Sequence, residues 1–499
     1  MAGESSSMFR VHSPSVQSIA IATRAEVIRR PAREALSLTT DTRDDLGGAC
    51  FVALRGERFD GHDFVAQAAA AGAAFAIVER VPEESVLAAL PAGFGLLRVA
   101  STRAALGAIA HAWRKSILRL RVVAITGSAG KTTTRRLVEG ILSEAGPTHA
   151  SPKSFNNDIG VPLTLLSTPD EARFLVAEIG MNHPGEILPL TEMAEPEAAI
   201  ITLAGRAHLE GLGSVEAVAT EKASILAGVS ATGVGIVNGD NPPLLEAIER
   251  LIDAGTAPTR IVTFGLGAGC DYRLAGRTPI DGGLGGQSIE VVIPRSRRDE
   301  DDLDGRRTYR LAMAGEHNAR NALAAVALAI EMGIPDACIG RGLEKVAATD
   351  MRLERLSIAG RTVFNDAYNA NPDAMIASLG AFAELATGAP ARVAILGEMR
   401  ELGVDARLLH AEVGRAAARV LGPNDLLVAV GPHADALIGG ATSAGYAGRS
   451  AAAAEFSEEF AAEVAARIPA GAAVLLKGSR GARMERFLSP LERTLASTA

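Results

Sequence analysis

The chain has 499 residues, which at the usual domain size suggests about three domains. Its 48% hydrophobic content supports folded cores, whereas a net charge of −8 and 4% aromatic residues argue against a nucleic-acid-binding protein. Three widely spaced cysteines offer neither a disulfide framework nor a cysteine zinc site. The first residues lack the apolar core of a secretion signal, and the nearby apolar stretch 68–78 is too short to span a membrane. We therefore expect a cytoplasmic protein without membrane insertion.

Short apolar runs rich in Val and Ile alternate along the chain with longer helical patterns. This alternation is typical of parallel strands joined by crossover helices in an α/β protein. It runs twice, before about residue 240 and after about residue 360, and the charge-rich run 295–307 between them is expected to be a solvated loop. We predict three domains, 1–118 (with about 1–35 unassigned), 119–347 and 348–499. Expected strands include 121–126, 174–179, 198–203, 393–396, 426–430 and 473–476.

A strand, a glycine-rich turn and a helical pattern follow one another at 121–142. Glycines let backbone N–H groups converge on phosphate oxygens, and the start of a helix adds positive potential. A turn without a ligand is the weaker alternative, although Ile125 stands where the usual phosphate-loop pattern has its first glycine. Lys131 would then reach the β- and γ-phosphates, and the Thr132 hydroxyl would ligate magnesium. The predicted loop is Gly127, Ser128, Ala129, Gly130, Lys131, Thr132 and Thr133.

Polar residues stand at the ends of two later strands, where open α/β sheets bind ligands. Glu178 ends one apolar run, and His208 lies in the loop after another. Taken singly, Glu178 could cap a helix and His208 could be structural. Beside a phosphate loop, the two are candidates for a second magnesium site, with an oxygen from Glu178 and a nitrogen from His208.

Lys222 lies on the apolar stripe of a helical pattern that follows Ser214. Burial would lower the pKa of this lysine because desolvation disfavours the charged form. A neutral amine could form a Schiff base or take up carbon dioxide as a carbamate. Alternatively, the side chain could extend along the surface into solvent.

Together with further motifs, these residues resemble the Mur ligases, ATP-dependent enzymes of peptidoglycan precursor synthesis. The resemblance covers nearly the whole chain from about residue 36, and its motifs occur in the family's order. The first 35 residues fit the pattern poorly. The motifs are at 126–133, 154–162, 178–182, 208–210, 221–222, 315–321, 352–354, 365–372, 396–399 and 477–480.

The resemblance implies an α/β architecture of three domains: an N-terminal domain for a UDP-linked substrate, a central phosphate-loop ATPase domain with a mostly parallel sheet, and a C-terminal Rossmann-like domain. It implies catalytic roles for Lys131, Glu178, His208 and Lys222, with Lys222 carboxylated. Magnesium would be held by Thr132, Glu178, His208 and the Lys222 carbamate. Without the family context, the remaining ATP residues would be interpreted as cap or turn residues. They are Asn318 and Asn321 near the adenine, and Arg352, Asp366, Tyr368 and Asn369 from the third domain.

The segment 369–372 favours the branch of the family that joins D-alanyl-D-alanine to UDP-N-acetylmuramoyl-tripeptide. The diaminopimelate-adding branch typically has a DNPR-like motif, and this chain contains no DNPR string. Lys477 and Arg480 could offer positive charge to the dipeptide carboxylate. The substrate residues that the resemblance implies are Thr42, Arg43, His62, Asp63, Asn156, Asn157, Asn371, Lys477, Ser479 and Arg480.

The implied reaction uses ATP to convert a carboxylate into an acyl phosphate, which an amine then attacks, releasing ADP and phosphate. The protein would act as a monomer on these two substrates, with closure of the C-terminal domain onto the nucleotide. Two alternatives remain: the same chemistry on another acceptor, as in diaminopimelate-adding ligases or folylpolyglutamate synthetases, and a nucleotide-binding regulator without catalysis. A regulator would have no use for two metal sites.

Overall fold

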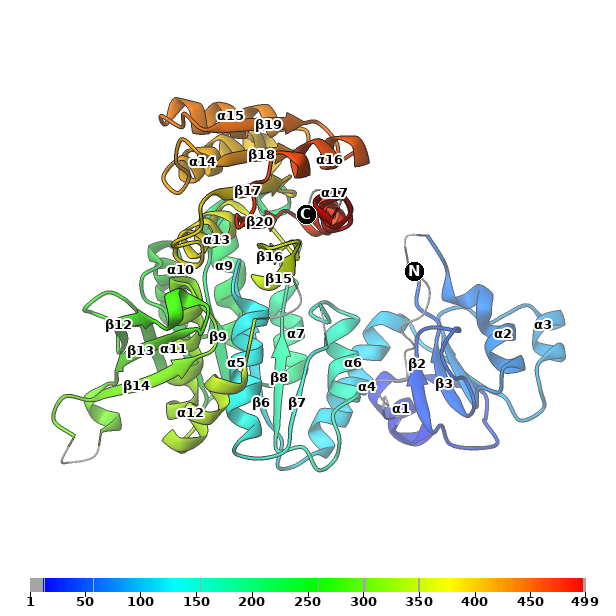
Figure 1. Ribbon diagram of the computed structural model, residues 1–499. Helices are drawn as coiled ribbons and strands as arrows, with labels where there is room; N and C mark the ends of the chain where they lie inside the picture. The colour runs from blue at the N-terminus through cyan, green and yellow to red at the C-terminus, as the bar shows by residue number, and fades with distance from the viewer. Residues whose placement is uncertain are drawn as a thin grey trace.

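The chain folds into three sheets, each packed against its own set of helices. The structure is a computed structural model that describes residues 12, 14–56, 58–152, 154–258, 260–298, 302–348 and 351–496. The middle unit contacts both of the others, and the C-terminal unit lies over the edge at which the central parallel strands end (Figure 1). The predicted α/β architecture of three units is confirmed.

The first unit is a five-stranded sheet in the order β1-β5-β4-β3-β2, parallel except for β1. One face is covered by α2 and α3, and the other packs through α4 onto the core of the central unit. Its elements are α1 (Val16–Thr23), β1 (Glu26–Arg29), β2 (Ser37–Thr39), β3 (Ala49–Val52), α2 (Val65–Ala70), β4 (Phe75–Val78), α3 (Glu84–Ala89), β5 (Gly95–Arg98) and α4 (Thr102–Ser116).

The central unit is a nine-stranded sheet in the order β14-β13-β12-β11-β10-β9-β6-β8-β7. The seven strands from β7 to β12 in this order run parallel to one another. Strands β13 and β14 extend the sheet beyond β12, and each runs antiparallel to its neighbour. Its strands are β6 (Arg121–Thr126), β7 (Thr148–Ala150), β8 (Phe174–Glu178), β9 (Ala198–Ile201), β10 (Val234–Asn238), β11 (Arg260–Gly265), β12 (Tyr272–Pro279), β13 (Gln287–Val292) and β14 (Arg306–Leu311). Its helices are α5 (Lys131–Ser143), α6 (Gly160–Leu166), α7 (Ile187–Ala194), α8 (Leu209–Leu212), α9 (Val215–Ala223), α10 (Pro242–Asp253), α11 (Glu316–Glu331) and α12 (Asp336–Lys345).

The third unit is a six-stranded sheet in the order β15-β16-β20-β17-β18-β19, parallel except for β15. Helices α13, α14 and α15 cover one face, and α16 and α17 cover the other. Its elements are β15 (Glu354–Ile358), β16 (Arg361–Asp366), α13 (Pro372–Leu385), β17 (Arg392–Gly397), α14 (Ala406–Ala418), β18 (Leu426–Val430), α15 (Ala434–Ser443), β19 (Arg449–Ala453), α16 (Glu458–Ala466), β20 (Ala473–Lys477) and α17 (Leu488–Ala496).

Alternate residues of the central strands pack on opposite faces of the sheet, as the two-residue period of a strand requires. Val122 and Ala124 of β6 face α4, α6 and α7, whereas Val123 and Ile125 face α5 and α11. This double covering explains why the strands are continuously apolar in sequence. In the part of the chain that the structure describes, no helix combines the length and the apolar character needed to cross a bilayer.

Candidate active site

The glycine-rich turn lies between β6 and α5, as the sequence predicts. Gly130 caps α5 with φ +84°, and a Cβ there would overlap the side-chain amide of Asn321. Gly127 has φ +154°, and a Cβ would overlap the Thr202 hydroxyl. Only glycine accommodates both the backbone conformation and the close neighbours at these positions.

Lys131 and Thr132 begin α5 and face the end of β8. The Lys131 ammonium donates to the Gly127 carbonyl at 2.6 Å, and the Thr132 hydroxyl donates to Glu178 Oε2 at 2.9 Å. The other oxygen of Glu178 accepts from the Asn156 side-chain amide at 3.1 Å. Burial lowers the pKa of Lys131, and the negative charge of Glu178 partly opposes that effect. Hard oxygen donors and one cation thus meet at the phosphate loop.

Lys222 is buried on α9, with 1% of its surface exposed, so its side chain does not extend into solvent. The Ser214 hydroxyl caps this helix by accepting from the Ala217 amide at 3.2 Å. Burial, and then the positive charge of nearby Lys131, lower the pKa of Lys222 well below its usual value. The neutral amine is therefore favoured at this position.

His208 precedes α8 and has a left-handed backbone, with φ +57°. Its Nδ1 lies 2.7 Å from a carboxylate oxygen of Glu401, which reaches across from the C-terminal unit. The His208 ring lowers the pKa of the Glu401 carboxyl. Sequence reasoning did not select Glu401, although it stands two residues beyond the motif at 396–399.

A metal ion beside Thr132 and Glu178 would need ligands other than carboxylate and imidazole groups. Among the described residues, no group of three His, Cys, Asp or Glu side chains is arranged to hold a metal ion. The Thr132 and Glu178 oxygens do form a pair of hard donors. The donor chemistry therefore fits magnesium provided that hydroxyl and carbamate oxygens complete the set.

A cavity of about 620 Å³ opens beside the phosphate loop, between the central and C-terminal units. Asn318 and Asn321 of α11 line it from below, and the Asn318 amide donates to the Ala314 carbonyl at 2.7 Å. A volume of this size suits a small-molecule ligand such as a nucleotide. The predicted ATP residues that line the cavity are Ala129, Gly130, Thr133, Asn318, Asn321, Arg352 and Asp366.

Arg352 and Asp366 enter the cavity from the C-terminal unit. The Arg352 guanidinium stacks over the Tyr368 ring, 4.3 Å from its centre, and the Tyr368 hydroxyl contacts that of Ser154 in the central unit. Asp366 binds the Lys477 ammonium at 2.6 Å, and this pair is mostly buried. Lys477 also lines this cavity, and its charge is already partnered by Asp366.

Other predicted residues of the C-terminal unit make contacts within the protein. The Asn371 amide donates to the Ser128 carbonyl at 3.0 Å, and its oxygen caps α13. The Lys477 ammonium also donates to the Asn369 carbonyl at 3.1 Å. Ser479 is buried, with its hydroxyl accepting from the Arg400 amide at 3.0 Å, and Arg480 pairs with Glu485 at 2.8 Å.

The predicted residues of the N-terminal unit are distant from the phosphate loop in sequence and lie outside the strands of the first sheet, in the turn after β2 and in the short 3-10 helix Gly61–Phe64. His62 is buried: Nδ1 contacts Asp60 at 2.6 Å, and Nε2 accepts from the Glu79 amide at 2.8 Å. Arg43, which follows the half-buried Thr42, is exposed and pairs with Asp41. Asp63 pairs with Arg80 at 2.7 Å at the surface.

A second cavity of about 740 Å³ lies between α4 and the loops of the central unit. Asn157 lines it, and its side-chain oxygen also accepts from the Gly160 amide at 2.9 Å. Arg103 lines the same hollow and binds Asp158 at 2.6 Å. Asn157 thus lies on the side of the loop that faces the first unit, whereas the Asn156 amide is directed to Glu178.

Ion pairs between the central and C-terminal units were not predicted from the sequence. Arg206, after β9, binds Asp373 at 2.6 Å and Glu412 at 2.6 Å. Asp373 is 167 residues away along the chain, so no local pattern signals this contact. These pairs hold the C-terminal unit against the loop that carries His208.

Comparisons with known proteins agree with this arrangement. Three family models match: the Mur ligase family catalytic domain at 37–114, the Mur ligase middle domain at 125–329, and the Mur ligase glutamate ligase domain at 351–480. The chain is 35% identical, over 91% of its length and 93% of the relative, to UDP-N-acetylmuramoyl-tripeptide–D-alanyl-D-alanine ligase of Escherichia coli (strain K12). It is also 35% identical to the Bacillus subtilis (strain 168) ligase of the same name, over 76% of each chain.

Solved structures with the same arrangement include a crystal structure of MurF from Acinetobacter baumannii. That structure has a TM-score of 0.83 and 32% identity, with 97% of this chain and 100% of that chain covered. MurF ligase from Thermotoga maritima in complex with ADP has a TM-score of 0.77 and 25% identity, covering 94% and 99% of the two chains.

Proposed function

The chain belongs to the Mur ligase family, and we propose that it joins D-alanyl-D-alanine to UDP-N-acetylmuramoyl-tripeptide, driven by ATP and releasing ADP and phosphate. The observation that carries this proposal is the similarity, over nearly the full chain, to ligases of that name. The phosphate loop, the buried Glu178 and the cavity between two units supply the matching chemistry. We assign the reaction to a monomer in the cytoplasm, where its nucleotide substrates are available.

The central unit would bind ATP and the C-terminal unit would cover it. The backbone N–H groups of the loop and the start of α5 would face the phosphates, and Lys131 would add a positive charge. Arg352 would add a second cation from the opposite wall. Transfer of a phosphoryl group between two anions needs this concentration of positive charge.

Magnesium is part of the proposal, held by Thr132, Glu178, His208 and the carbamate of Lys222. Burial lowers the pKa of Lys222 and so favours its neutral amine, the form that takes up carbon dioxide. Glu178 is already oriented by the Asn156 amide. When bound, the metal would offset negative charge on the phosphates.

The chemical steps can be stated in terms of substrate atoms. The terminal carboxylate of the tripeptide takes the γ-phosphoryl group of ATP and becomes an acyl phosphate. The amine of D-alanyl-D-alanine then attacks the acyl carbon, an amide bond forms and phosphate leaves. We propose that domain 1–118 holds the UDP end of the substrate, 119–347 the nucleotide, and 348–499 the incoming dipeptide.

The test is ADP release by the purified full-length chain, with the tripeptide substrate and the dipeptide supplied singly and together. We expect release only when both are present, and a product whose mass is that of the two substrates less one water. Efficient use of free diaminopimelate with a UDP-muramoyl-dipeptide, and no use of D-alanyl-D-alanine, would contradict the proposal. No turnover with any pair of substrates would instead support a non-catalytic regulator.

A further inference from the structure

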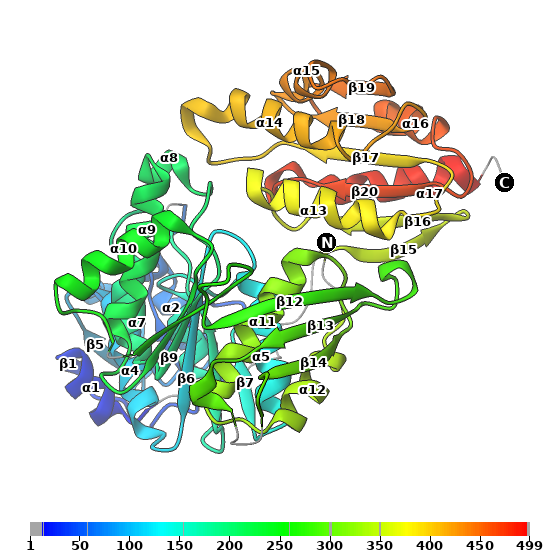
Figure 2. The same cartoon turned by 90° about the vertical axis from the view of Figure 1, so that its left-hand side faces the viewer.

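Helix α13 forms one wall of the cavity between the central and C-terminal units. Ile376, Ala377, Ser378, Gly380 and Ala381 of this helix line the cavity. In Figure 2, helix α13 of the C-terminal unit faces α11 and β12 of the central unit. A helix of 14 residues is about 21 Å long, so it extends well beyond the phosphate loop.

The first turn of α13 is fixed near the phosphate loop by several contacts. Asn371 donates to the Ser128 carbonyl at 3.0 Å, and Asp373 accepts from both the backbone and the guanidinium of Arg206. Arg206 also binds Glu412 on the neighbouring helix α14. Breaking any one of these contacts would leave the others to hold this end of α13.

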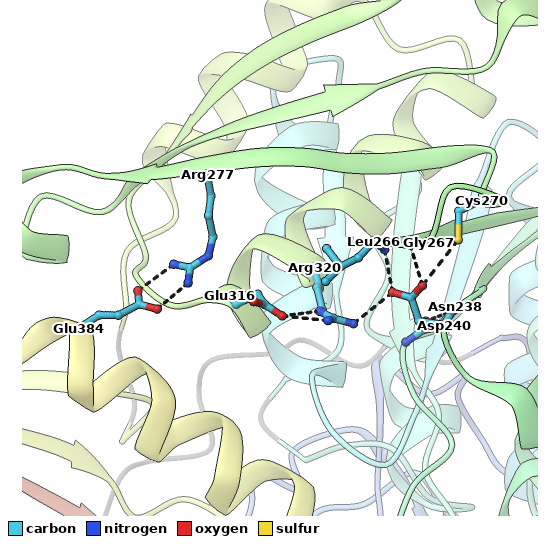
Figure 3. Close-up of polar contacts among 9 residues, drawn as sticks. All are labelled: Asn238, Asp240, Leu266, Gly267, Cys270, Arg277, Glu316, Arg320 and Glu384. Carbon is cyan, nitrogen blue, oxygen red and sulfur yellow. Dashed lines mark hydrogen bonds and ion pairs between the residues drawn. The ribbon is translucent and has the colours of Figure 1, made fainter. Parts of the chain in front are cut away.

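The last turn of α13 is held differently, at the far end of the cavity. Glu384 binds both terminal nitrogens of Arg277 on β12, at 2.7 and 2.5 Å (Figure 3). Strand β12 is four strands from β6, a lateral separation of about 19 Å across the sheet. Leu385 packs beside Gly283, which adds an apolar contact. Among the described residues, the Arg277–Glu384 ion pair is therefore the charged contact that joins the last turn of α13 to β12.

Neighbouring charged residues have partners of their own. Arg320 binds Glu316 at 2.8 Å and Asp240 at 3.2 Å, and Asp240 accepts from backbone amides of the loop after β11 (Figure 3). Arg277 and Glu384 line the cavity together with Glu316 and Arg320. The side chains of Arg277 and Glu384 are 23% and 28% exposed, so water and salt can reach this ion pair.

We propose that the Arg277–Glu384 ion pair is the releasable clamp of the nucleotide cavity. While the pair is formed, it holds the last turn of α13 against β12 over the bound nucleotide. When it opens, this end of the cavity opens and the nucleotide leaves or enters. The proposal rests on the proposed function, because it takes this cavity as the ATP site, and it makes Arg277 and Glu384 positioning residues.

The test measures the dissociation rate of a fluorescent ADP analogue, mant-ADP, from the full-length protein by stopped-flow chase with excess ADP. Mant-ADP should dissociate about fivefold faster from Glu384→Gln and from Arg277→Gln than from wild type, as expected for loss of about 1 kcal/mol from a partly exposed ion pair. The charge swap Arg277→Glu/Glu384→Arg should return the rate to within about twofold of wild type. Raising the salt from about 0.05 to about 0.5 M should speed dissociation from wild type by a larger factor than dissociation from Glu384→Gln, which lacks the ion pair.

A matched control exists within the C-terminal unit. Asp435 binds Arg407 at 2.6 and 3.1 Å across α14 and α15, so Asp435→Asn removes an ion pair of the same two-nitrogen type, more exposed to solvent and away from the cavity. This variant should release mant-ADP at the wild-type rate. An unchanged rate in Glu384→Gln, or a swap that fails to restore the rate, would overturn the clamp. Wild-type protein that does not bind mant-ADP at all would overturn the nucleotide site itself, and with it the proposed function.

Discussion

Removal of Lys131 is the perturbation whose size can be worked out most directly. One unit charge about 4 Å from a phosphate oxygen, at an effective dielectric constant of about 20, contributes about 4 kcal/mol. If that attraction is realised in the transition state, Lys131→Ala lowers kcat/KM by about 1,000-fold, since about 1.4 kcal/mol corresponds to a factor of ten. Stability should change little, because burial disfavours the charged form of Lys131 and lowers its pKa, so its charge contributes little to folding.

The assay is ADP release with both substrates present, alongside circular dichroism and thermal unfolding of each variant. Lys131→Met is the matched control, because it keeps the aliphatic stem and removes only the charged end. Both variants should be folded and equally inactive. A folded Ala variant with wild-type turnover would refute the phosphate-loop assignment, and activity restored by Met alone would show that packing, not charge, is what the reaction needs.

Three further predictions concern other parts of the chain. Lys222→Ala and Lys222→Arg should both lose turnover, and short carboxylic acids should partly restore only the Ala variant; near-normal activity of Lys222→Arg would exclude the carbamate. Burial, and then His12, lower the pKa of His149 to about 4, so the unfolded chain binds a proton that the folded chain does not. Between pH about 6.5 and 4 the titration of His149 should therefore remove about 3 kcal/mol of stability, and urea unfolding of His149→Gln should show a decline that lacks this contribution. A Cβ on Gly414 would overlap the Leu437 carbonyl, so Gly414→Ala should destabilise the C-terminal unit by about 1–3 kcal/mol in urea, whereas Gly439→Ala, with open space around it, should not.

Local patterns were enough to predict the phosphate loop and the strands around it. The run 121–126 is a buried strand, Gly130 caps the next helix, and Glu178 ends β8 beside Thr132. Each of these features depends on residues close together in the sequence, and on the rule that parallel strands end at one edge of a sheet. Helical periodicity located Lys222 on an apolar stripe but left burial and extension into solvent as alternatives, and the structure shows burial.

Contacts between units could not be predicted in this way. Asn371 and Ser128 are 243 residues apart, and Glu401 meets His208 only because two units dock. The antiparallel extension was also missed, because its last strand, β14, begins at Arg306 within the run 295–307 that was expected to be a solvated loop. Residues 299–301 of that run lie outside the described residues.

Several residues selected by resemblance have contacts that composition and spacing do not reveal. The ring of His62 is enclosed between Asp60 and the Glu79 amide, and Lys477 is paired with Asp366 inside the cavity between the central and C-terminal units. Ser479 links two loops of the C-terminal unit. Their roles toward the UDP-linked substrate and the dipeptide stay predictions, which substitution of each residue followed by KM measurement for the two substrates would test.

The central claim is tested most directly by the product of a single reaction mixture. Full-length protein, ATP, magnesium, UDP-N-acetylmuramoyl-tripeptide and D-alanyl-D-alanine are combined, and the UDP-linked products are identified by mass spectrometry. The account predicts one new species carrying the added dipeptide, formed in equal amount to ADP and absent when either substrate or Lys131 is removed. ADP formation without that species, or the species formed equally well by Lys131→Ala, would contradict it.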